Sequence, residues 1–344
     1  MATYNRRGLI LCASSLAVVA LIAAVPGSAA ATPRPSLHQV QVRVDKLNSQ
    51  AGDAAELYND SRVRFAEANR RLTVVKHRLA AKQAEVDAMQ SSVGQLAAAA
   101  YKSGGLDPTV QILLSDNPES FLQSAVALNQ LGRQQAAVLA QVVAARQGLA
   151  AARNDVTQQR ARASALAEQI KSQKHAIDTK LAEAKQLLGT LKADQLAKYN
   201  AAIRATAARG HSVASRSRTG NIPSYNGPAS GRASEAIKTA YAQLGDPYVF
   251  GAAGPGAFDC SGLTMFAWGS AGVSLPHSSA AQYSSGRHVS ESDLQPGDLV
   301  FYYSPISHVA IYIGGGRIIH APHPGRSVEI VGLHMMPYVG ATRP

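Results

Sequence analysis

Two long stretches of this chain place apolar residues at alternating steps of three and four positions. The first stretch predicts a helix with a seam of Leu37, Val40, Val44, Leu47, Ala51, Ala54, Tyr58, Phe65, Ala68, Leu72, Val75, Leu79, Val86, Met89, Val93, Leu96 and Ala100, which Ser61 and Lys82 interrupt. This spacing is typical of a coiled-coil seam. At ~1.5 Å per residue, the helix would be about 96 Å long.

The second stretch predicts a helix of similar length. Its seam is Phe121, Leu128, Leu131, Val138, Val142, Ala145, Leu149, Ala152, Val156, Ala163, Leu166, Ile170, Ile177, Ala184, Leu187 and Leu191, with Ser124, Gln135, Gln159, Gln173 and Lys180 as interruptions. The pairs Gly104-Gly105 and Asp107-Pro108 break the chain between the two stretches. We therefore expect residues 36–200 to form an antiparallel coiled-coil hairpin, although the same seam would also suit dimerisation of two chains.

Residues 201–232 have a different composition, rich in Ser, Arg, Gly, Asn and Pro. No acidic residue lies between Asp194 and Glu235, whereas this segment and its edges carry Lys198, Arg204, Arg209, Arg216, Arg218 and Arg232. This composition predicts a basic, flexible linker.

Residues 233–344 show the pattern of a separate α+β domain. A helix is predicted from Ser234, a residue suited to an N-cap, to Gly245, which ends it. Short β-prone runs punctuated by Gly follow at 298–303, 308–313 and 317–320. We expect helices packed on an antiparallel sheet.

The N-terminus predicts a secretory signal peptide over residues 1–31. Arg6 and Arg7 precede an apolar run over 9–25, and Ala29-Ala30-Ala31 provides a cleavage site. A membrane anchor is the alternative, but the run is short for a span of ~20 residues and ends in Pro26-Gly27. We expect a protein secreted to the cell wall or periplasmic space, by either the Sec or the twin-arginine route.

The positive charge is unevenly distributed. The chain carries 34 Lys and Arg against 22 Asp and Glu, a formal net charge of +12, and removal of the signal leaves +10. Residues 233–344 hold five basic and seven acidic side chains, so their net charge is −2. The basic excess of the helices and linker suits a polyanionic wall or anionic membrane face, and we do not expect a nucleic-acid partner.

Cys260 is the one cysteine that remains after Cys12 leaves with the signal. Gly and Pro are dense up to Pro255-Gly256, and an amphipathic run begins after Asp259, which places Cys260 at or near the first turn of a helix. A helix N-terminus and a nearby imidazole both lower a thiol pKa. We therefore interpret Cys260 as a nucleophile rather than a buried structural cysteine.

A proton acceptor for Cys260 is expected from the predicted hairpin at 308–320. Strand alternation and a short Gly314-Gly315-Gly316 loop would place His320 opposite Ala310, on the same face as His308. We assign the proton transfer to His308 and the orientation of its ring to His320. Zinc bound by Cys260, His308, His320 and His323 is the rival, but short-range ligand pairs are missing, so no metal or cofactor is expected. The geometric argument does not extend to His277, His288 and His334, which we expect at the surface or in the core.

Six segments of residues 234–344 resemble, in order and spacing, the motifs of the NlpC/p60 cysteine peptidases. They are Gly245-Asp246-Pro247-Tyr248-Val249-Phe250-Gly251, Asp259-Cys260-Ser261-Gly262-Leu263, Leu275-Pro276-His277-Ser278-Ser279, Gln295-Pro296-Gly297-Asp298-Leu299-Val300-Phe301, His308-Val309-Ala310-Ile311-Tyr312-Ile313-Gly314 and Ile319-His320-Ala321. Two departures are Phe250-Gly251-Ala252, where the family often has Trp-Gly-Gly, and His277, where Arg is common.

The resemblance implies a papain-like fold and a triad of Cys260, His308 and His320. It also implies cleavage within peptidoglycan stem peptides, commonly between D-glutamate and meso-diaminopimelate. By the same resemblance, the substrate-binding residues are Tyr248 near the oxyanion, Asp259 and Ser261 on the N-terminal side of the peptide, and Ser278 in a pocket.

Two other classes of protein remain open: a non-catalytic activator of another wall hydrolase, and an amidase or acyltransferase on a related Cys-His fold. A membrane or division-complex protein is a candidate partner for the coil. The coil itself has two candidate roles. It would either fold back over Cys260 as a cover or act as a spacer that positions the enzyme in the wall.

Overall fold

A computed structural model describes residues 35–102, 118–218 and 231–344 of the chain. The predicted signal peptide at 1–31 and the predicted break at 104–108 lie outside these ranges. Within these ranges, no helix is both long enough and apolar enough to cross a membrane.

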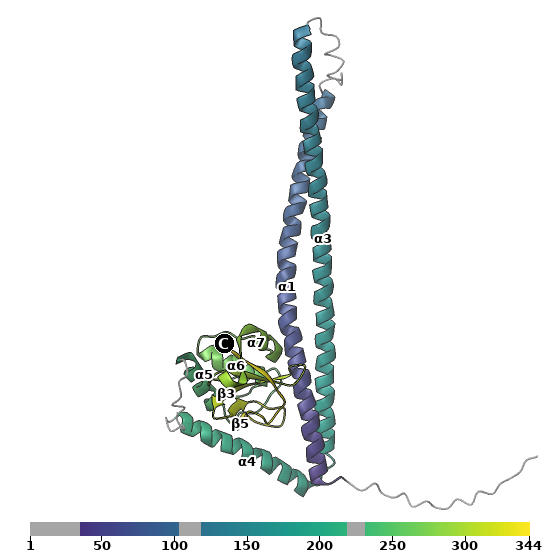
Figure 1. Ribbon diagram of the computed structural model, residues 1–344. Helices are drawn as coiled ribbons and strands as arrows, with labels where there is room; N and C mark the ends of the chain where they lie inside the picture. The colour runs from purple at the N-terminus through teal and green to yellow at the C-terminus, as the bar shows by residue number, and fades with distance from the viewer. Residues whose placement is uncertain (1–34, 103–117, 219–230) are drawn as a thin grey trace, which may run out of the picture. The chain divides into compact units, whose positions relative to one another are not determined.

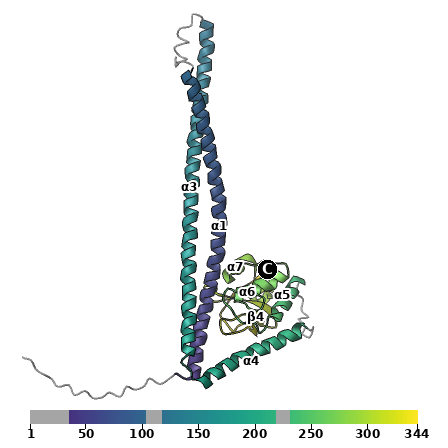
Figure 2. The ribbon, with the colours of Figure 1, turned by 180° about the vertical axis from the view of Figure 1, so that it is seen from behind.

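Two long helices pack side by side (Figures 1 and 2). They are α1 (Leu37–Lys102) and α3 (Pro118–Leu188). Val40 and Val44 near the start of α1 share an apolar cluster with Ala184 near the end of α3, whereas Val86 packs on Ala145. Early α1 therefore meets late α3, which confirms the predicted antiparallel hairpin.

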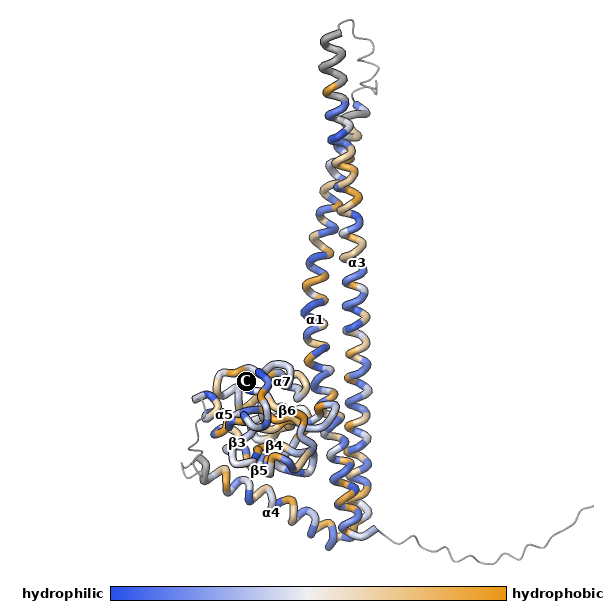
Figure 3. The backbone as a smooth tube through the Cα atoms, in the orientation of Figure 1, coloured by the Kyte–Doolittle hydropathy of each residue, from blue (hydrophilic) through white to orange (hydrophobic). Residues whose placement is uncertain are grey.

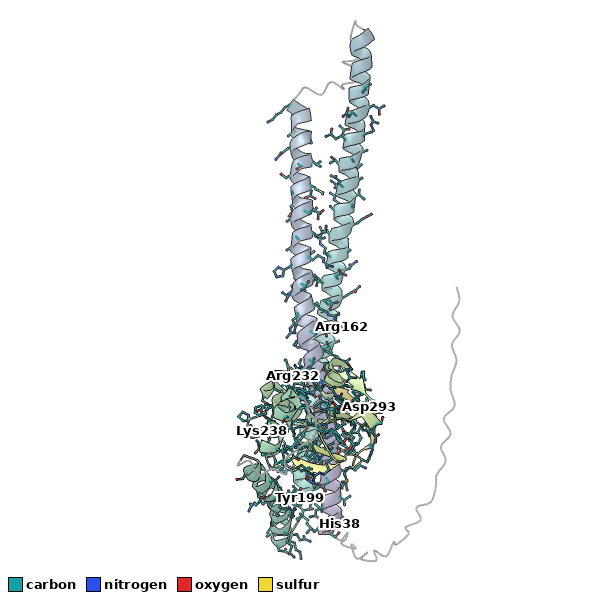
Figure 4. The ribbon with its side chains drawn as sticks, turned by 60° about the vertical axis from the view of Figure 1, so that its left-hand side comes forward. His38, Arg162, Tyr199, Arg232, Lys238 and Asp293 are labelled. Atoms are coloured by element: carbon teal, nitrogen blue, oxygen red, sulfur yellow. The ribbon has the colours of Figure 1, made fainter. Side chains whose placement is uncertain are left out.

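Helix α4 (Ala193–Arg218) occupies much of the segment predicted to be a flexible linker. The segment is rich in Ala, the best helix former, and Tyr199 packs against the cluster of Val40 and Val44, so local propensity and packing favour a helix. Figure 4 labels Tyr199 on α4 near His38 of α1. The rest of the predicted linker, residues 219–230, lies outside the described residues.

The C-terminal residues form three helices and an antiparallel sheet, as the predicted α+β class requires. The helices are α5 (Gly231–Ala242), α6 (Cys260–Ser270) and α7 (Ser279–Ser285), and a 3-10 turn covers Glu291–Asp293. The strands are β1 (Arg287–Val289), β2 (Leu299–Tyr302), β3 (His308–Gly314), β4 (Arg317–His320), β5 (Glu329–Gly332) and β6 (Tyr338–Arg343). They lie in the order β1-β6-β2-β3-β4-β5.

The centre of the sheet is buried on both faces, since every residue of β2 and the first four of β3 are buried. Figure 3 shows apolar positions of this part of the chain in orange. On one face, Leu263 of α6 joins Val309 and Ile311 in a cluster that also includes α5. On the other face, Val300 and Ala310 pack with residues of the β5–β6 region. Burial from both sides holds β3, and therefore His308, rigidly.

The β3–β4 hairpin has the predicted side-chain register. Ile311 pairs with Ile319, and one further step along this register sets Ala310 opposite His320. The turn is tighter than expected, because Gly314 pairs with Arg317 across a register shift. Gly315 and Gly316 have φ angles of 61° and 67°, a left-handed conformation that favours glycine.

Candidate active site

Cys260 is the first residue of α6. Asp259, in an extended conformation, caps this helix and accepts a hydrogen bond of 2.7 Å from the backbone N–H of Gly262. The cap directs the chain into the helix at this position, so the thiol lies at the positive end of the helix dipole. Cys260 is a free, buried cysteine with 2% of its surface exposed.

His308 and His320 form a hydrogen-bonded pair at the adjoining ends of β3 and β4. Nε2 of His308 lies 2.9 Å from Nδ1 of His320, and the ring planes are nearly perpendicular, at 88°. When Nε2–H of His308 donates to His320, Nδ1 of His308 keeps a lone pair that can accept a proton. Nε2 of His320 is 3.8 Å from Oε1 of Glu329, beyond direct hydrogen-bond distance.

One cavity of about 410 Å³ brings together the three residues predicted as catalytic. Its lining includes Cys260, His308, His320 and Tyr248, together with Asp53 of α1. The hydroxyl of Tyr248 is buried and has no hydrogen-bond partner among the described residues. It is therefore free to donate within this cavity.

Burial keeps both imidazoles neutral. Burial lowers the pKa of His308 to about 3. The charge of His323 lowers this pKa further, and the charge of Asp259 partly opposes the shift. Burial also lowers the pKa of His320 well below its usual value, as do the charges of His308, Arg326 and His323. A neutral His308 is the form that can take a proton from a thiol.

The thiol of Cys260 is held in its protonated form. Burial raises its pKa well above the usual value, the negative charges of Glu56 and Asp259 raise it further, and so does a hydrogen bond to Glu56. The backbone of Val309 opposes this shift. The reactive thiolate is therefore disfavoured in this arrangement.

Helix α1 inserts Glu56 beside the thiol. Oε1 of Glu56 accepts hydrogen bonds from Oγ of Ser261, at 2.7 Å, and from Sγ of Cys260, at 3.2 Å. Oε2 accepts the backbone N–H of Ser279 at 2.7 Å. Glu56 is only 2% exposed, and burial and the nearby Asp259 raise its pKa.

Further contacts of α1 lie on both sides of Glu56. Nδ2 of Asn59 donates to Oδ2 of Asp259 at 2.9 Å, and Oγ of Ser307 donates to Oδ1 of Asp53 at 2.8 Å. The rings of Tyr58 and Phe250 meet edge to face at 5.0 Å between centroids. These contacts hold α1 along the cleft.

The four residues predicted to bind substrate divide into two groups. Tyr248 lines the cavity together with Cys260, His308 and His320. Burial raises the pKa of Tyr248 well above the usual value, and the charges of Cys260 and Asp259 raise it further. Asp259, Ser261 and Ser278 instead contact α1, the last through a 3.4 Å bond to Asp60. Ser278 also caps α7, accepting the N–H of Ala281 at 3.2 Å.

Three polar residues of this region were not predicted from the sequence: Glu56, Asn59 and His277. Glu56 and Asn59 fall outside the predicted seam, so periodicity gave no reason to select them. The small residues Ala51-Gly52 gave a weak signal that another segment approaches α1 closely. A Cβ on Gly52 would lie 3.5 Å from Cβ of His323. His277, expected at the surface or in the core, contacts Asp259 through Nε2.

Comparisons with known proteins identify the C-terminal part of the chain. Residues 245–339 match the NlpC/P60 family model. A protein of Mycobacterium tuberculosis named as a probable endopeptidase is 48% identical over 103 residues, which cover 30% of this chain and 27% of the relative. One of Corynebacterium glutamicum with a similar name is 43% identical over 116 residues, covering 34% of this chain and 56% of the relative.

Among solved structures, the NlpC/p60 domain of the peptidoglycan hydrolase SagA is 36% identical, covering 33% of this chain and 98% of that domain, with a TM-score of 0.31. The chain spans about a quarter of the length of the mycobacterial relative, at 27%. The C-terminal part of this chain is an NlpC/P60 domain, as the sequence motifs predicted.

Proposed function

We propose that this protein is an exported cysteine endopeptidase that cleaves peptidoglycan stem peptides between D-glutamate and meso-diaminopimelate or an equivalent residue. One observation carries the proposal: Cys260 begins α6 in the same cavity as the hydrogen-bonded pair of His308 and His320. The names of the relatives, probable endopeptidases, support the same activity.

The proposed mechanism has two covalent steps. His308 accepts the thiol proton, the sulfur of Cys260 bonds to the peptide carbonyl carbon, and the C–N bond breaks as His308 returns the proton to the leaving amine. Water then hydrolyses the thioester, which releases the carboxylate and restores the thiol. His320 orients His308, and Tyr248 is available to donate a hydrogen bond to the oxyanion.

In this proposal, the arrangement with α1 in the cleft is the resting state. Glu56 takes up the hydrogen bonds of Ser261 and the Ser279 N–H, and its charge opposes ionisation of Cys260. These contacts favour the covering role of the coil over the spacer role. Activation requires α1 to leave the cleft, and a bias of a few kcal/mol would be enough to control it.

The proposed location is the cell wall or periplasmic space. The basic excess outside residues 233–344 would bind the anionic wall. A membrane or division-complex protein that binds the helical hairpin would withdraw α1 from the cleft. The proposed substrate is therefore a wall polymer, and nucleic acid is not a proposed partner.

Mass spectrometry of digested muropeptides tests the function. The mature chain, residues 32–344, is compared with the same chain carrying Glu56→Ala, and Cys260→Ala is the control. A new amino terminus on the diamino acid supports an endopeptidase, whereas release of the intact stem peptide indicates an amidase. Absence of product from both active chains would contradict the proposal and favour a non-catalytic activator.

A further inference from the structure

The carboxylate of Asp259 is a buried charge next to the proposed nucleophile. Its side chain has no exposed surface. Two of its hydrogen-bond donors are neutral backbone groups, the N–H of Gly262 at 2.7 Å and of Gly251 at 3.0 Å. A buried carboxylate is costly unless an opposite charge accompanies it. The site therefore requires a positive partner for Asp259.

His277 can provide that positive charge. Nε2 of His277 lies 2.8 Å from Oδ1 and 2.9 Å from Oδ2 of Asp259, so its N–H is shared between both oxygens. Within the described ranges, it is the ionisable base paired with this carboxylate. The His277 side chain is 19% exposed, which allows its proton to exchange with solvent.

The charged groups that face His277 come from two elements. Asp259 lies at the start of α6, and Glu56 and Arg62 belong to α1. Burial and Arg62 lower the pKa of His277, but the hydrogen bond and charge of Asp259, together with Glu56, outweigh them and raise it. The imidazolium form is favoured beside Asp259.

Asp259 also presents an acceptor toward the cleft. In the described arrangement, its Oδ2 receives the amide N–H of Asn59 from α1. Withdrawal of α1 would leave this oxygen beside Cys260, ready for an N–H of a bound peptide. Among the residues that the structure describes, the side chain of His277 hydrogen-bonds to Asp259 and not to Cys260 or His308, so His277 would act on the substrate through Asp259.

We propose that His277 is a positioning residue for substrate binding: its imidazolium holds Asp259 in the orientation that accepts a peptide N–H, and it thereby makes peptide affinity depend on pH. This inference rests on the proposed function. Affinity is full while His277 is protonated and falls as rising pH removes the proton. The maximal rate changes little, because His277 does not touch the reacting atoms.

A binding titration tests the inference without turnover. The full-length chain carries Cys260→Ala, which prevents cleavage, and Glu56→Ala, which removes the competing carboxylate. A synthetic Ala-γ-Glu-diaminopimelate peptide is titrated calorimetrically at about pH 6 and pH 8.5, values that bracket the usual His pKa of ~6.5 and a raised one. We expect roughly tenfold weaker binding at the higher pH, the size of effect that one weakened charge-assisted hydrogen bond produces.

Three variants assign the effect to His277. His277→Arg keeps the charge at both pH values, so it should abolish the pH dependence and retain tight binding. His277→Gln keeps a donor without charge, so it should bind weakly at both. His334→Gln is the control, because His334 pairs with Glu291 at an exposed site, and it should behave like the parent.

The outcomes separate this inference from the proposed function. Binding that does not depend on pH, or a pH dependence that persists in His277→Arg, would overturn the role of His277. In the catalytically active Glu56→Ala chain, His277→Gln should raise KM roughly tenfold at about pH 6 and change kcat less than twofold, whereas His277→Arg and His334→Gln should leave KM near the parent value at that pH; a change in kcat alone would also overturn the role of His277. Normal pH-dependent binding without any cleavage would refute the endopeptidase activity but keep the positioning role of His277. No binding at either pH would refute both the activity and this role.

Discussion

The thiol of Cys260 donates a hydrogen bond of 3.2 Å to Oε1 of Glu56, although 204 positions separate the two residues in the chain. Glu56 belongs to the long helix α1 and Cys260 to the N-terminus of α6. The contact joins the helical hairpin to the chemistry of the NlpC/P60 domain. A residue outside the NlpC/P60 domain therefore raises the pKa of the proposed nucleophile.

The first prediction concerns the nucleophile and its base. Cys260→Ala and His308→Ala should each reduce stem-peptide cleavage by at least about a thousandfold, because the two groups act as one unit. His320→Ala should retain measurable activity, since His320 orients His308 and does not react. Initial rates on purified muropeptides measure all three in the Glu56→Ala chain. Near-normal turnover by Cys260→Ala would refute the thiol mechanism, and loss of activity on adding a chelator would favour zinc.

Release of the cover is the subject of the second prediction. Glu56→Ala in the full chain should raise the rate of stem-peptide cleavage roughly tenfold or more, because a shift of ~1.4 kcal/mol changes a population ratio tenfold. Soluble muropeptides are the substrate, since they need no binding to the wall. Glu67→Ala is the matched control, a glutamate of the same helix with a side chain that is 54% exposed and paired with Arg71. Equal rates for wild type and Glu56→Ala would leave α1 as a spacer.

A third prediction follows from the raised pKa of Cys260. Burial is the main cause, and the charge and hydrogen bond of Glu56 add to it. Thiolate should therefore form in the wild type only at pH values well above those of an ordinary thiol. Glu56→Ala removes two of the causes, so the pH midpoint of Cys260 alkylation should move downward. Iodoacetamide labelling followed by mass spectrometry measures it, and an unchanged or higher midpoint would contradict this account.

The fourth prediction concerns the close approach at the start of α6. A Cβ on Gly262 would collide with the backbone oxygen of Ala252, which accepts the N–H of Asp259. Gly262→Ala should therefore lower the free energy of unfolding by about 1–3 kcal/mol, the usual cost of overpacking. Gly269→Ala, in the same helix with open space around its Cβ, should be neutral or stabilising by up to about 1 kcal/mol. Denaturant titrations compare the two, and equal stabilities would show that Ala252 moves aside.

Wall binding provides the fifth prediction. The basic excess lies in residues 32–232, so this fragment and the full chain should both sediment with purified cell wall and should both be released by added salt. The reason is that salt screens exposed charges beyond ~8 Å at physiological ionic strength. The fragment 233–344, with a net charge of −2, should sediment poorly. Salt-resistant sedimentation of both fragments to the same extent would contradict this assignment.

The position of Cys260, the proposed nucleophile, at the start of a helix was predictable because its causes are local. The Asp259 cap and the apolar run that follows it set where α6 begins, so Cys260 could be placed at a helix N-terminus from sequence. The pairing of His308 with His320 was equally accessible, since a short turn and the two-residue period of strands determine which side chains share a face. The seam periodicity likewise predicted the helical hairpin.

Other features depended on packing between distant segments. Residues 201–218 have linker-like composition, but the early part of α4 packs against α1 and the segment is helical. Glu56 and His277 carry no local pattern that reveals their partners, Cys260 and Asp259. Periodicity reports which face of an element is apolar, whereas the pairing of polar groups across 204 positions depends on how whole elements dock. The sequence by itself therefore determined the elements and the positions of Cys260 and of the His308–His320 pair, and only the tertiary structure decided which charges surround them.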